Sequence, residues 1–550
     1  MGTCGRLLIV LGAVSTSIFV SRARRIIPAG LVLALAVGCG GSGGGSEPKA
    51  TPNAESKTQP PAGGAPAPAG TTPPTAKPIG ADDPALKEFY GRQLAWAKCP
   101  DDKRTKGDEG MLECAKLRVP LDYANPAAES IELQAYRRKA TGERLGILAV
   151  DPGGPGSGVQ GMTASFALRP ALGERYDIVG IDPRGTGGSN PVTCVDDAGT
   201  DRYKGIDPTP DDPAELERIT TYFKEFADGC TARAGKMLAH LGTEDVVRDL
   251  DVLRGVLGED KLNYFGYSYG TFLGAVYLEK FPTHSGRLVL DAPINPALDR
   301  VAGARSQAQG FERTFQAFLT DCLKQRDCPL DGTPAEATRK LADRLHELGR
   351  TPLTTAQGRT IGEGEVVNVI AQGIYSERSW KDLRITLRAY LRDDAAKAAA
   401  ETDPWLGRDR NGAYPGDHTA ANLTINCADG RSLTMAEADR LAREVADTMP
   451  ITGPGTVWSF AADCRPNGTD RARPIQAPGA PPVLVIGSTG DPATPYEQAQ
   501  ALTPQLPGAV LLTREANGHG SYNRGNTCVD GAVETYLVKG ELPAAGTRCG

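Results

Sequence analysis

The residues of clearest chemical meaning are Gly266-Tyr267-Ser268-Tyr269-Gly270, which match the pattern G-x-S-x-G. The same pattern occurs at 40–44, in a glycine-rich segment where it carries no meaning, so the motif alone is weak evidence. Ser268 differs because a predicted strand, 262–265, precedes it and a predicted helix, 269–280, follows it. In a nucleophile elbow, flanking glycines permit a sharp strand-to-helix turn that exposes the serine hydroxyl. We therefore predict that Ser268 is a nucleophile; the alternative is a glycine-bounded turn with a capping serine.

The general base is found by elimination, because the chain has only five histidines. Four of them precede the serine, follow its helix too closely or lie in a predicted insertion: His240, His284, His346 and His418. The fifth, His519, lies in the glycine-bounded segment 515–520, after the last predicted strand. An α/β hydrolase places its base in such a loop. We predict that His519 is the base, although a lone loop histidine is more often a solvated surface residue.

The carboxylate partner should lie between the serine and the histidine, directly after a strand. Asp491 meets this condition, because it follows the predicted strand 483–486. Asp291, at the end of the predicted strand 288–290, is the alternative, and its other role would be to hold the loop at the strand end. We prefer Asp491, which would fix the tautomer of His519 while His519 takes the proton of Ser268.

A tetrahedral intermediate also needs N–H donors that are already in place for its oxyanion. One predicted donor is the backbone N–H of Tyr269, directly after the nucleophile. The other should come from Gly153 or Gly154, in a loop that follows the predicted strand 145–150. Two adjacent glycines let the backbone approach a substrate closely. The alternative interpretation of this loop is a plain tight turn.

These residues need a scaffold, and short apolar strands that alternate with helices indicate one. Further strands are predicted at 131–135, 176–181 and 510–512, and the segment 243–257 has helical periodicity with Thr243 as a plausible N-cap. Short apolar strands separated by helices are typical of a parallel sheet. The predicted fold class is therefore α/β, an α/β-hydrolase fold with a mostly parallel central sheet and an inserted helical cap.

The chain divides into five predicted segments. The cap is expected because the strand–helix rhythm stops and polar helical stretches take over, at 311–325, 335–348, 362–375 and 434–447. The five segments are a signal peptide (1–38), a flexible tether (39–82), the first part of the core (83–300), the cap (301–478) and the C-terminal part of the core with the acid and base (479–550).

The N-terminal residues predict export from a bacterial cell. A basic stretch precedes the apolar residues 26–37, which are too few to span a bilayer permanently. Ala36-Val37-Gly38-Cys39 resembles a lipobox, in which the cysteine is lipidated. We expect Cys39 to anchor the protein at the outer face of the cytoplasmic membrane, with simple secretion as the alternative. The following segment, rich in Gly, Ala, Pro, Ser and Thr, is typical of a flexible tether.

Charge and cysteine content narrow the possible partners. With 61 Lys+Arg against 67 Asp+Glu, the net charge of −6 argues against a phosphate-binding surface, so no nucleic-acid partner is expected. The cysteines form no Cys-x-x-Cys pair and no histidine has zinc-finger spacing, so we expect no metal and no cofactor. An even set of ten remains after Cys4 and Cys39, which favours disulfides in an exported chain. Sequential pairing would give Cys99–Cys114, Cys194–Cys230, Cys322–Cys328, Cys427–Cys464 and Cys528–Cys549.

Four motifs that occur together in order resemble those of the secreted bacterial tripeptidyl aminopeptidases. They are Gly-Gly-Pro-Gly at 153–156, Asp-Pro-Arg-Gly-Thr-Gly-Gly-Ser at 182–189, Gly-Tyr-Ser-Tyr-Gly-Thr at 266–271 and Gly-Asp-Pro-Ala-Thr-Pro at 490–495. The resemblance covers roughly 90–550 and implies a serine peptidase of the proline iminopeptidase branch, with a TAP-like C-terminal segment. It also implies that Ser268, Asp491 and His519 are the triad. Proline iminopeptidases have a histidine where this chain has Pro152, so proline specificity is not implied.

The resemblance further implies a peptide substrate with a free N-terminus, whose ammonium group needs an anionic partner. We expect the cap to supply it through Asp429, with Glu363 and Glu365 as further candidates, although cap carboxylates are more often solvated. The leading hypothesis is an exported aminopeptidase that releases tripeptide-type fragments. A carboxylesterase or lipase on the same fold is the second hypothesis. A peptide-binding lipoprotein without activity is the third, and the complete Ser/His/Asp set disfavours it.

Overall fold

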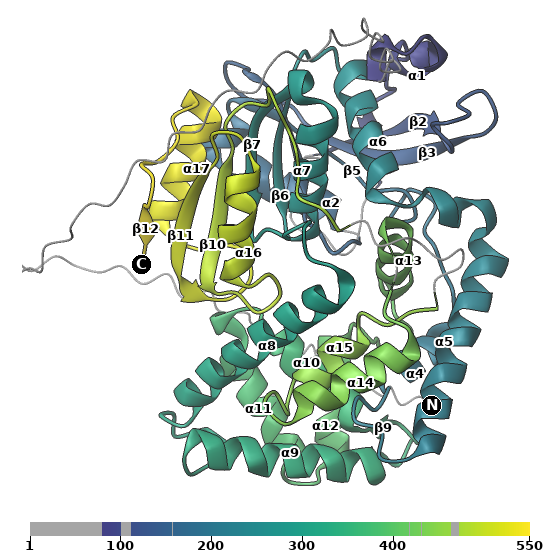
Figure 1. The fold of residues 1–550 in the computed structure, drawn as a ribbon, viewed down its shortest axis with the longest axis vertical. Coiled ribbons are helices and arrows are strands. Elements are labelled where there is room, and N and C mark those ends of the chain that lie inside the picture. The colour runs from purple at the N-terminus through teal and green to yellow at the C-terminus, as the bar shows by residue number, and fades with distance from the viewer. Residues whose placement is uncertain (1–79, 101–111, 157, 417, 431, 464–471) are drawn as a thin grey trace, which may run out of the picture. The chain divides into compact units, whose positions relative to one another are not determined.

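The computed structural model describes residues 80–100, 112–156, 158–416, 418–430, 432–463 and 472–550. A ten-stranded sheet runs through them in the order β1-β2-β3-β5-β4-β6-β7-β10-β11-β12 (Figure 1). The strands from β5 to β12 in this order are parallel, and β1, β2 and β3 add an antiparallel edge. The strands are β1 (Ala97–Lys98), β2 (Glu113–Pro120), β3 (Ser130–Arg138), β4 (Gly146–Asp151), β5 (Tyr176–Ile181), β6 (Leu262–Tyr267), β7 (Ser285–Asp291), β10 (Leu484–Gly490), β11 (Val510–Asn517) and β12 (Arg548–Cys549). The predicted α/β-hydrolase fold with a mostly parallel sheet is confirmed.

Helices cover both faces of this sheet, which explains why its inner strands are apolar throughout. On β4, Ile147 and Ala149 belong to one core cluster, and Leu148 and Val150 belong to another. Successive side chains of a strand point to opposite faces, so a strand covered on both sides needs a continuous apolar run. The first cluster includes residues of α6 (Thr243–Val256), α7 (Tyr269–Lys280) and α16 (Tyr496–Leu502); the second includes residues of α2 (Val159–Ala167) and α17 (Thr527–Lys539).

A large helical insertion separates β7 from β10 and forms the cap (Figure 1). Many of its apolar side chains, among them Phe315, Leu341, Ile370 and Leu387, form a core cluster of their own, while those of α13, α14 and α15 belong to the first cluster of the sheet. The elements are α8 (Arg300–Cys322), α9 (Pro334–Arg350), the short pair β8 (Leu353–Thr354) and β9 (Thr360–Ile361), α10 (Glu363–Gly373), α11 (Trp380–Tyr390), α12 (Ala395–Leu406), α13 (Thr419–Asp429), α14 (Met435–Ala446) and α15 (Gly453–Trp458).

A second insertion, which the sequence did not reveal, joins the cap from between β5 and α6. It comprises α4 (Asp197–Lys204), α5 (Pro213–Ala234) and the 3-10 helix Gly235–His240. The Trp458 indole N–H donates to the carbonyl of Pro208 at 3.0 Å, and the Thr209 hydroxyl donates to Glu363 Oε1 at 2.9 Å. The cap is therefore built from two parts of the chain that lie on either side of the nucleophile motif.

Two local expectations need correction. Thr243 is not the N-cap of α6: Gly242 takes that position, and the Thr243 N–H donates to the Asp429 carboxylate. The last three residues of the predicted tether (39–82) form a 3-10 helix, Gly80–Asp82, in which Gly80 is buried. A β-carbon at Gly80 would meet Asp251 Oδ2 at 2.8 Å, so the backbone lies directly against α6.

The motif at 182–189 has a structural role at the turn after β5. The Arg184 side chain is fully buried and binds both carboxylate oxygens of Asp249 at 2.7 Å. It also donates to the carbonyl oxygens of Pro120 and Leu121, each at 2.8 Å. One buried guanidinium thus joins the ends of β2 and β5 to α6, and its charge is paired as burial requires.

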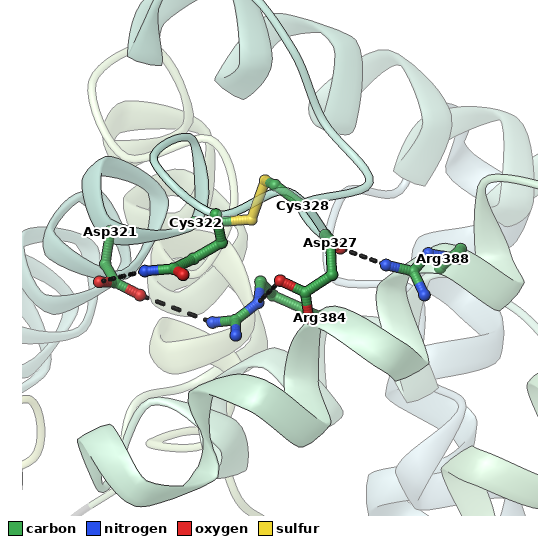
Figure 2. The surroundings of a disulfide bond; sticks show 7 residues. Asp321, Cys322, Asp327, Cys328, Arg384 and Arg388 are labelled. Atoms are coloured by element: carbon green, nitrogen blue, oxygen red, sulfur yellow. Dashed lines mark hydrogen bonds and ion pairs between the residues drawn. A yellow bond between two sulfur atoms is a disulfide. The ribbon is translucent and has the colours of Figure 1, made fainter.

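Within the described residues, four disulfides join cysteines in sequential pairs: Cys99–Cys114, Cys194–Cys230, Cys322–Cys328 and Cys528–Cys549. Cys464, of the expected pair Cys427–Cys464, and Cys39 lie outside the described residues. Figure 2 shows the Cys322–Cys328 bond at the end of α8, where Arg384 pairs with Asp327 at 3.1 Å and with Asp321 at 3.5 Å. In the part of the chain that the structure describes, no helix is long and apolar enough to cross a membrane.

Candidate active site

Ser268 occupies the turn between β6 and α7 with a backbone conformation that few non-glycine residues adopt. Its φ is 53° and its ψ is −121°. Close packing explains the flanking glycines: a β-carbon at Gly266 would meet the Gly270 carbonyl oxygen at 2.3 Å, and one at Gly270 would meet Asp151 Oδ1 at 2.8 Å. The Ser268 N–H donates to the carbonyl of Asp291 at 3.0 Å. This strained turn is the geometry of a nucleophile elbow.

The loop after β4 lies directly against this turn. A β-carbon at Gly153 would meet the Tyr267 carbonyl oxygen at 2.4 Å and the Tyr269 nitrogen at 3.0 Å, so only glycine fits there. The Gly153 N–H, however, donates to Asp151 Oδ1 at 2.8 Å. Gly154 has a φ of 113° and borders the same cavity as Ser268. The hydrogen bond to Asp151 occupies the N–H of Gly153. Of the two glycines expected to donate to an oxyanion, Gly154 is therefore the better candidate.

His519 and Asp491 are brought together at the ends of β11 and β10. His519 Nδ1 lies 2.9 Å from Asp491 Oδ1 and 3.0 Å from Oδ2. The Asp491 side chain is fully buried, and Oδ1 also accepts the N–H groups of Ala493 at 3.0 Å and Thr494 at 2.9 Å. These bonds hold the carboxylate facing the imidazole. The described residues show no hydrogen bond between Ser268 and His519, and such bonds often tighten only when substrate is bound.

Two opposing effects set the pKa of His519. Burial by itself lowers the pKa, but the charge of Asp491 and the hydrogen bond to it outweigh burial, so the pKa is raised above its ordinary value. The backbone N–H of His519 donates to the backbone carbonyl of Tyr375 at 2.9 Å, and the Tyr375 ring stands edge-on to the imidazole at 5.4 Å. The cap therefore contacts the histidine through Tyr375, which follows the end of α10.

Asp291, the alternative acid, has a different position. Its Oδ2 accepts the N–H groups of Ser521 at 2.9 Å and Tyr522 at 2.8 Å, and burial raises its pKa to about 6. It thus holds the loop that carries His519, while Asp491 contacts the ring itself. Asp151, behind the nucleophile helix, is also buried, and burial raises its pKa to about 7.

A cavity of about 390 Å³ includes Ser268 in its wall, and we call it the serine cavity. Core and cap both line it. Asp429 contributes to this wall, as does Asp299, which the sequence analysis missed. Asp299 caps α8 by accepting the Ala302 N–H at 2.7 Å. Its signal in the sequence is that of an ordinary helix N-cap, which does not reveal a cavity-lining carboxylate.

The three cap carboxylates expected to bind an ammonium group do not lie together. Asp429 borders the serine cavity, and its Oδ2 accepts the Thr243 hydroxyl at 2.8 Å. Glu363 and Glu365 instead line a different cavity of about 1080 Å³, between the second insertion and α10. Burial and the charge of Asp207 raise the pKa of Glu363 to about 8. Only Asp429 is placed near the serine.

The sequence of this chain matches a known protein family. Residues 450–549 match a family model described as TAP-like protein. Serine protease Hip1 of Mycobacterium tuberculosis is 34% identical over 482 residues, which are 84% of this chain and 91% of the relative.

Two further relatives are similar over almost the same length. Carboxylesterase B of Mycobacterium tuberculosis is 34% identical over 476 residues, covering 83% of this chain and 90% of its own. Tripeptidyl aminopeptidase of Streptomyces coelicolor is 32% identical over 454 residues, covering 80% of this chain and 83% of its own. These relatives are named as peptidases and as an esterase at similar identity. The comparison therefore supports a serine hydrolase, whether it cleaves amide or ester bonds.

Proposed function

This chain belongs to the TAP-like family of α/β hydrolases, and from that premise we propose that it is a serine aminopeptidase. Its substrate is a peptide with a free N-terminus, from which it releases a short, tripeptide-type fragment through an acyl-enzyme. The serine cavity carries this proposal, because both Ser268 and a carboxylate for the substrate's ammonium group, Asp429, line it. Tyr375 and Thr494, which contact His519, line the same cavity.

In the proposed mechanism, the Ser268 hydroxyl attacks the scissile carbonyl and His519 accepts its proton. Asp491 keeps the proton of His519 on Nδ1, so that Nε2 is free to act as the base, and stabilises the imidazolium that forms. The backbone N–H groups of Tyr269 and Gly154 donate to the oxyanion. His519 then protonates the leaving amine, and a water molecule attacks the acyl-enzyme by the same route.

Two carboxylates favour peptides over neutral esters as the substrate class. Asp299 and Asp429 both line the serine cavity, and no ester requires such groups. A desolvated ammonium needs an opposite charge within reach. Asp429, at the end of α13, is the stronger candidate of the two. It binds the Thr243 hydroxyl, which also forms a hydrogen bond with the hydroxyl of Tyr269, the residue after the nucleophile.

The protein is expected to work outside the cytoplasm. Four disulfides are typical of an oxidising compartment. Lipidation of Cys39 and a tether to 82 would hold the enzyme near the outer face of the membrane, where it meets exported peptides. Metabolic labelling with a fatty acid, compared between the native protein and Cys39→Ser, tests the anchor; unchanged labelling would refute it.

The decisive experiment for the activity is active-site labelling followed by a substrate comparison. A fluorophosphonate should label the native protein and fail to label Ser268→Ala. Tripeptidyl arylamides with a free N-terminus should then be cleaved faster than their N-acetylated forms and faster than short acyl esters.

Ester cleavage is the second candidate, because one similar relative is named a carboxylesterase. Turnover of acyl esters with no turnover of any arylamide would favour that function and contradict the peptidase. Absence of labelling at Ser268 would contradict both.

A further inference from the structure

A side chamber of about 200 Å³ adjoins the serine cavity within the cap. The two spaces share four lining residues: Tyr203, Gln307, Tyr375 and Ser459. These residues come from both insertions, since Tyr203 lies on α4 and Gln307 on α8. The chamber continues between α8, α10 and α15, which pack against one another in the cap (Figure 1).

Tyr375 joins the chamber to the base. Its carbonyl accepts the backbone N–H of His519 at 2.9 Å, and its ring contacts the imidazole edge-on. On the chamber side, the same ring contacts Phe311 at 5.6 Å. A substrate residue bound beside His519 would therefore lie next to Tyr375, which lines both spaces.

The chamber wall combines aromatic and aliphatic side chains with polar but uncharged ones, among them Gln307, Asn368 and Gln372. Among its lining residues, none is charged. Phe223, Phe311, Val367 and Trp458 are each at most 6% exposed. The serine cavity differs, because Asp299, Arg300 and Asp429 all line it.

Several polar side chains around the chamber are bonded within the protein. The Asn368 amide donates to the carbonyls of Lys204 at 2.9 Å and Gly364 at 3.0 Å. The Trp458 N–H donates to Pro208, and the Thr456 hydroxyl donates to the Thr452 carbonyl at 2.8 Å. A charged group entering the chamber would lose water and find no opposite charge among the lining residues, whereas an apolar group gains from burial.

We propose that this chamber binds an aromatic or branched aliphatic side chain of the substrate, on the residue whose carbonyl Ser268 attacks. The proposal rests on the peptidase function above and adds its side-chain specificity. The two spaces then have separate roles. The carboxylates of the serine cavity hold the ammonium end of the fragment, and the chamber holds the apolar side chain next to the scissile bond. Such a side chain should raise kcat/KM about 10- to 100-fold over alanine.

A panel of tripeptidyl arylamides that differ only in that residue tests the proposal. The native enzyme should prefer Phe and Leu to Ala, and should cleave the Asp and Lys substrates least. Ala371→Phe, on α10, places a ring in the chamber and should lower the ratio of kcat/KM for the Phe and Ala substrates at least about 10-fold. Because this ratio is measured within one enzyme preparation, it does not depend on the active fraction.

A second variant guards against misfolding of the first. Phe311→Leu removes a ring from the wall and should improve cleavage of a Trp substrate relative to the Phe substrate. The matched control is Ala400→Phe, at an exposed position of α12 that lines neither cavity, which should keep the native ratios.

The outcomes separate the chamber from the activity. If arylamides are cleaved without a preference, or if Ala371→Phe slows all substrates equally, the chamber assignment is wrong and the peptidase stands. A preference for Asp or Lys would also overturn it. If no arylamide is cleaved, the peptidase function fails and the side-chain assignment fails with it.

Discussion

Asp491 shows how much a single side chain can control in this site. It is fully buried, yet its oxygens face His519 and two backbone N–H groups, so the carboxylate is compensated without an arginine or lysine. Its charge also raises the pKa of His519 against the effect of burial. Asp291 also stands at the end of a strand, the neighbouring β7, but it accepts hydrogen bonds from the backbone of the loop instead.

Replacing Asp491 by Asn should lower kcat about 10⁴-fold, because an amide that donates to Nδ1 would favour the wrong tautomer of His519. The fold should persist, since Oδ1 can still accept the two N–H groups. Steady-state kinetics and the thermal midpoint check both parts. Asp260→Asn, at an exposed position, is the matched control. A larger loss of kcat from Asp291→Asn than from Asp491→Asn would reverse the assignment of the acid.

The raised pKa of His519 predicts the acid limb of the pH profile. The base must be neutral, so kcat/KM should increase with pH through the pKa of His519 in the free enzyme, above the ordinary value of about 6.5. Without the charge of Asp491, burial dominates, and the limb of the residual activity in Asp491→Asn should move to lower pH. A profile between about pH 5 and pH 9 tests this; a native limb below 6.5 would contradict it.

At the scale of elements, the site is assembled where parallel strands end. Four neighbouring strands of the sheet, β6, β7, β10 and β11, are parallel, so their carboxyl ends lie on the same side of the sheet. The residues at or just after these ends are Ser268, Asp291, Asp491 and His519. This convergence follows from parallel pairing and explains why strand-end positions identified the residues. The cap adds a helix-to-helix contact that no local pattern predicts: Asp429, at the end of α13, binds Thr243 at the start of α6.

Asp429→Asn separates the structural and binding roles of this carboxylate. The amide oxygen can still accept a hydrogen bond from Thr243, but the charge is lost. We expect KM for peptides with a free N-terminus to increase about 10-fold, which corresponds to about 1.4 kcal/mol, and N-blocked esters to be unaffected. Asp447→Asn, exposed after α14, is the control. Equal losses on both substrate types would show that Asp429 only caps α6.

At the scale of the whole molecule, the chain closes over its own sheet with two separate insertions. The large insertion carries α8 to α15 and the second insertion carries α4 and α5, and both line the serine cavity or its side chamber. Disulfides fasten both: Cys194–Cys230 ties the loop after β5 to α5, and Cys322–Cys328 closes the end of α8. Access to the serine is thus governed by residues far from it in the chain.

Loop length predicts which of these two bonds matters more for stability. Cys194 and Cys230 are 36 residues apart, and Cys322 and Cys328 are 6 apart. Loop entropy predicts losses of about 4 and about 2 kcal/mol in the free energy of unfolding when each pair is replaced by alanine. Denaturant unfolding of the two double variants, under oxidising conditions, gives the comparison. A larger loss for the shorter loop would contradict the loop-entropy account.

The sequence by itself was enough to predict the fold class and to single out Ser268, Asp491 and His519. The reason is physical: buried parallel strands leave short apolar runs, and an elbow or strand-end loop leaves glycines beside its polar residue. Such signals are local, so they survive without knowledge of distant contacts.

Tertiary structure decided what depends on contacts between distant residues. Only the folded chain shows that the Gly153 N–H is taken by Asp151, that residues 197–240 join the cap, and that Glu363 faces a different cavity from Asp429. The side chamber likewise exists only where α4, α8, α10 and α15 meet. A cap helix has the same amphipathic pattern whichever cavity its free face lines, so its sequence cannot specify that cavity.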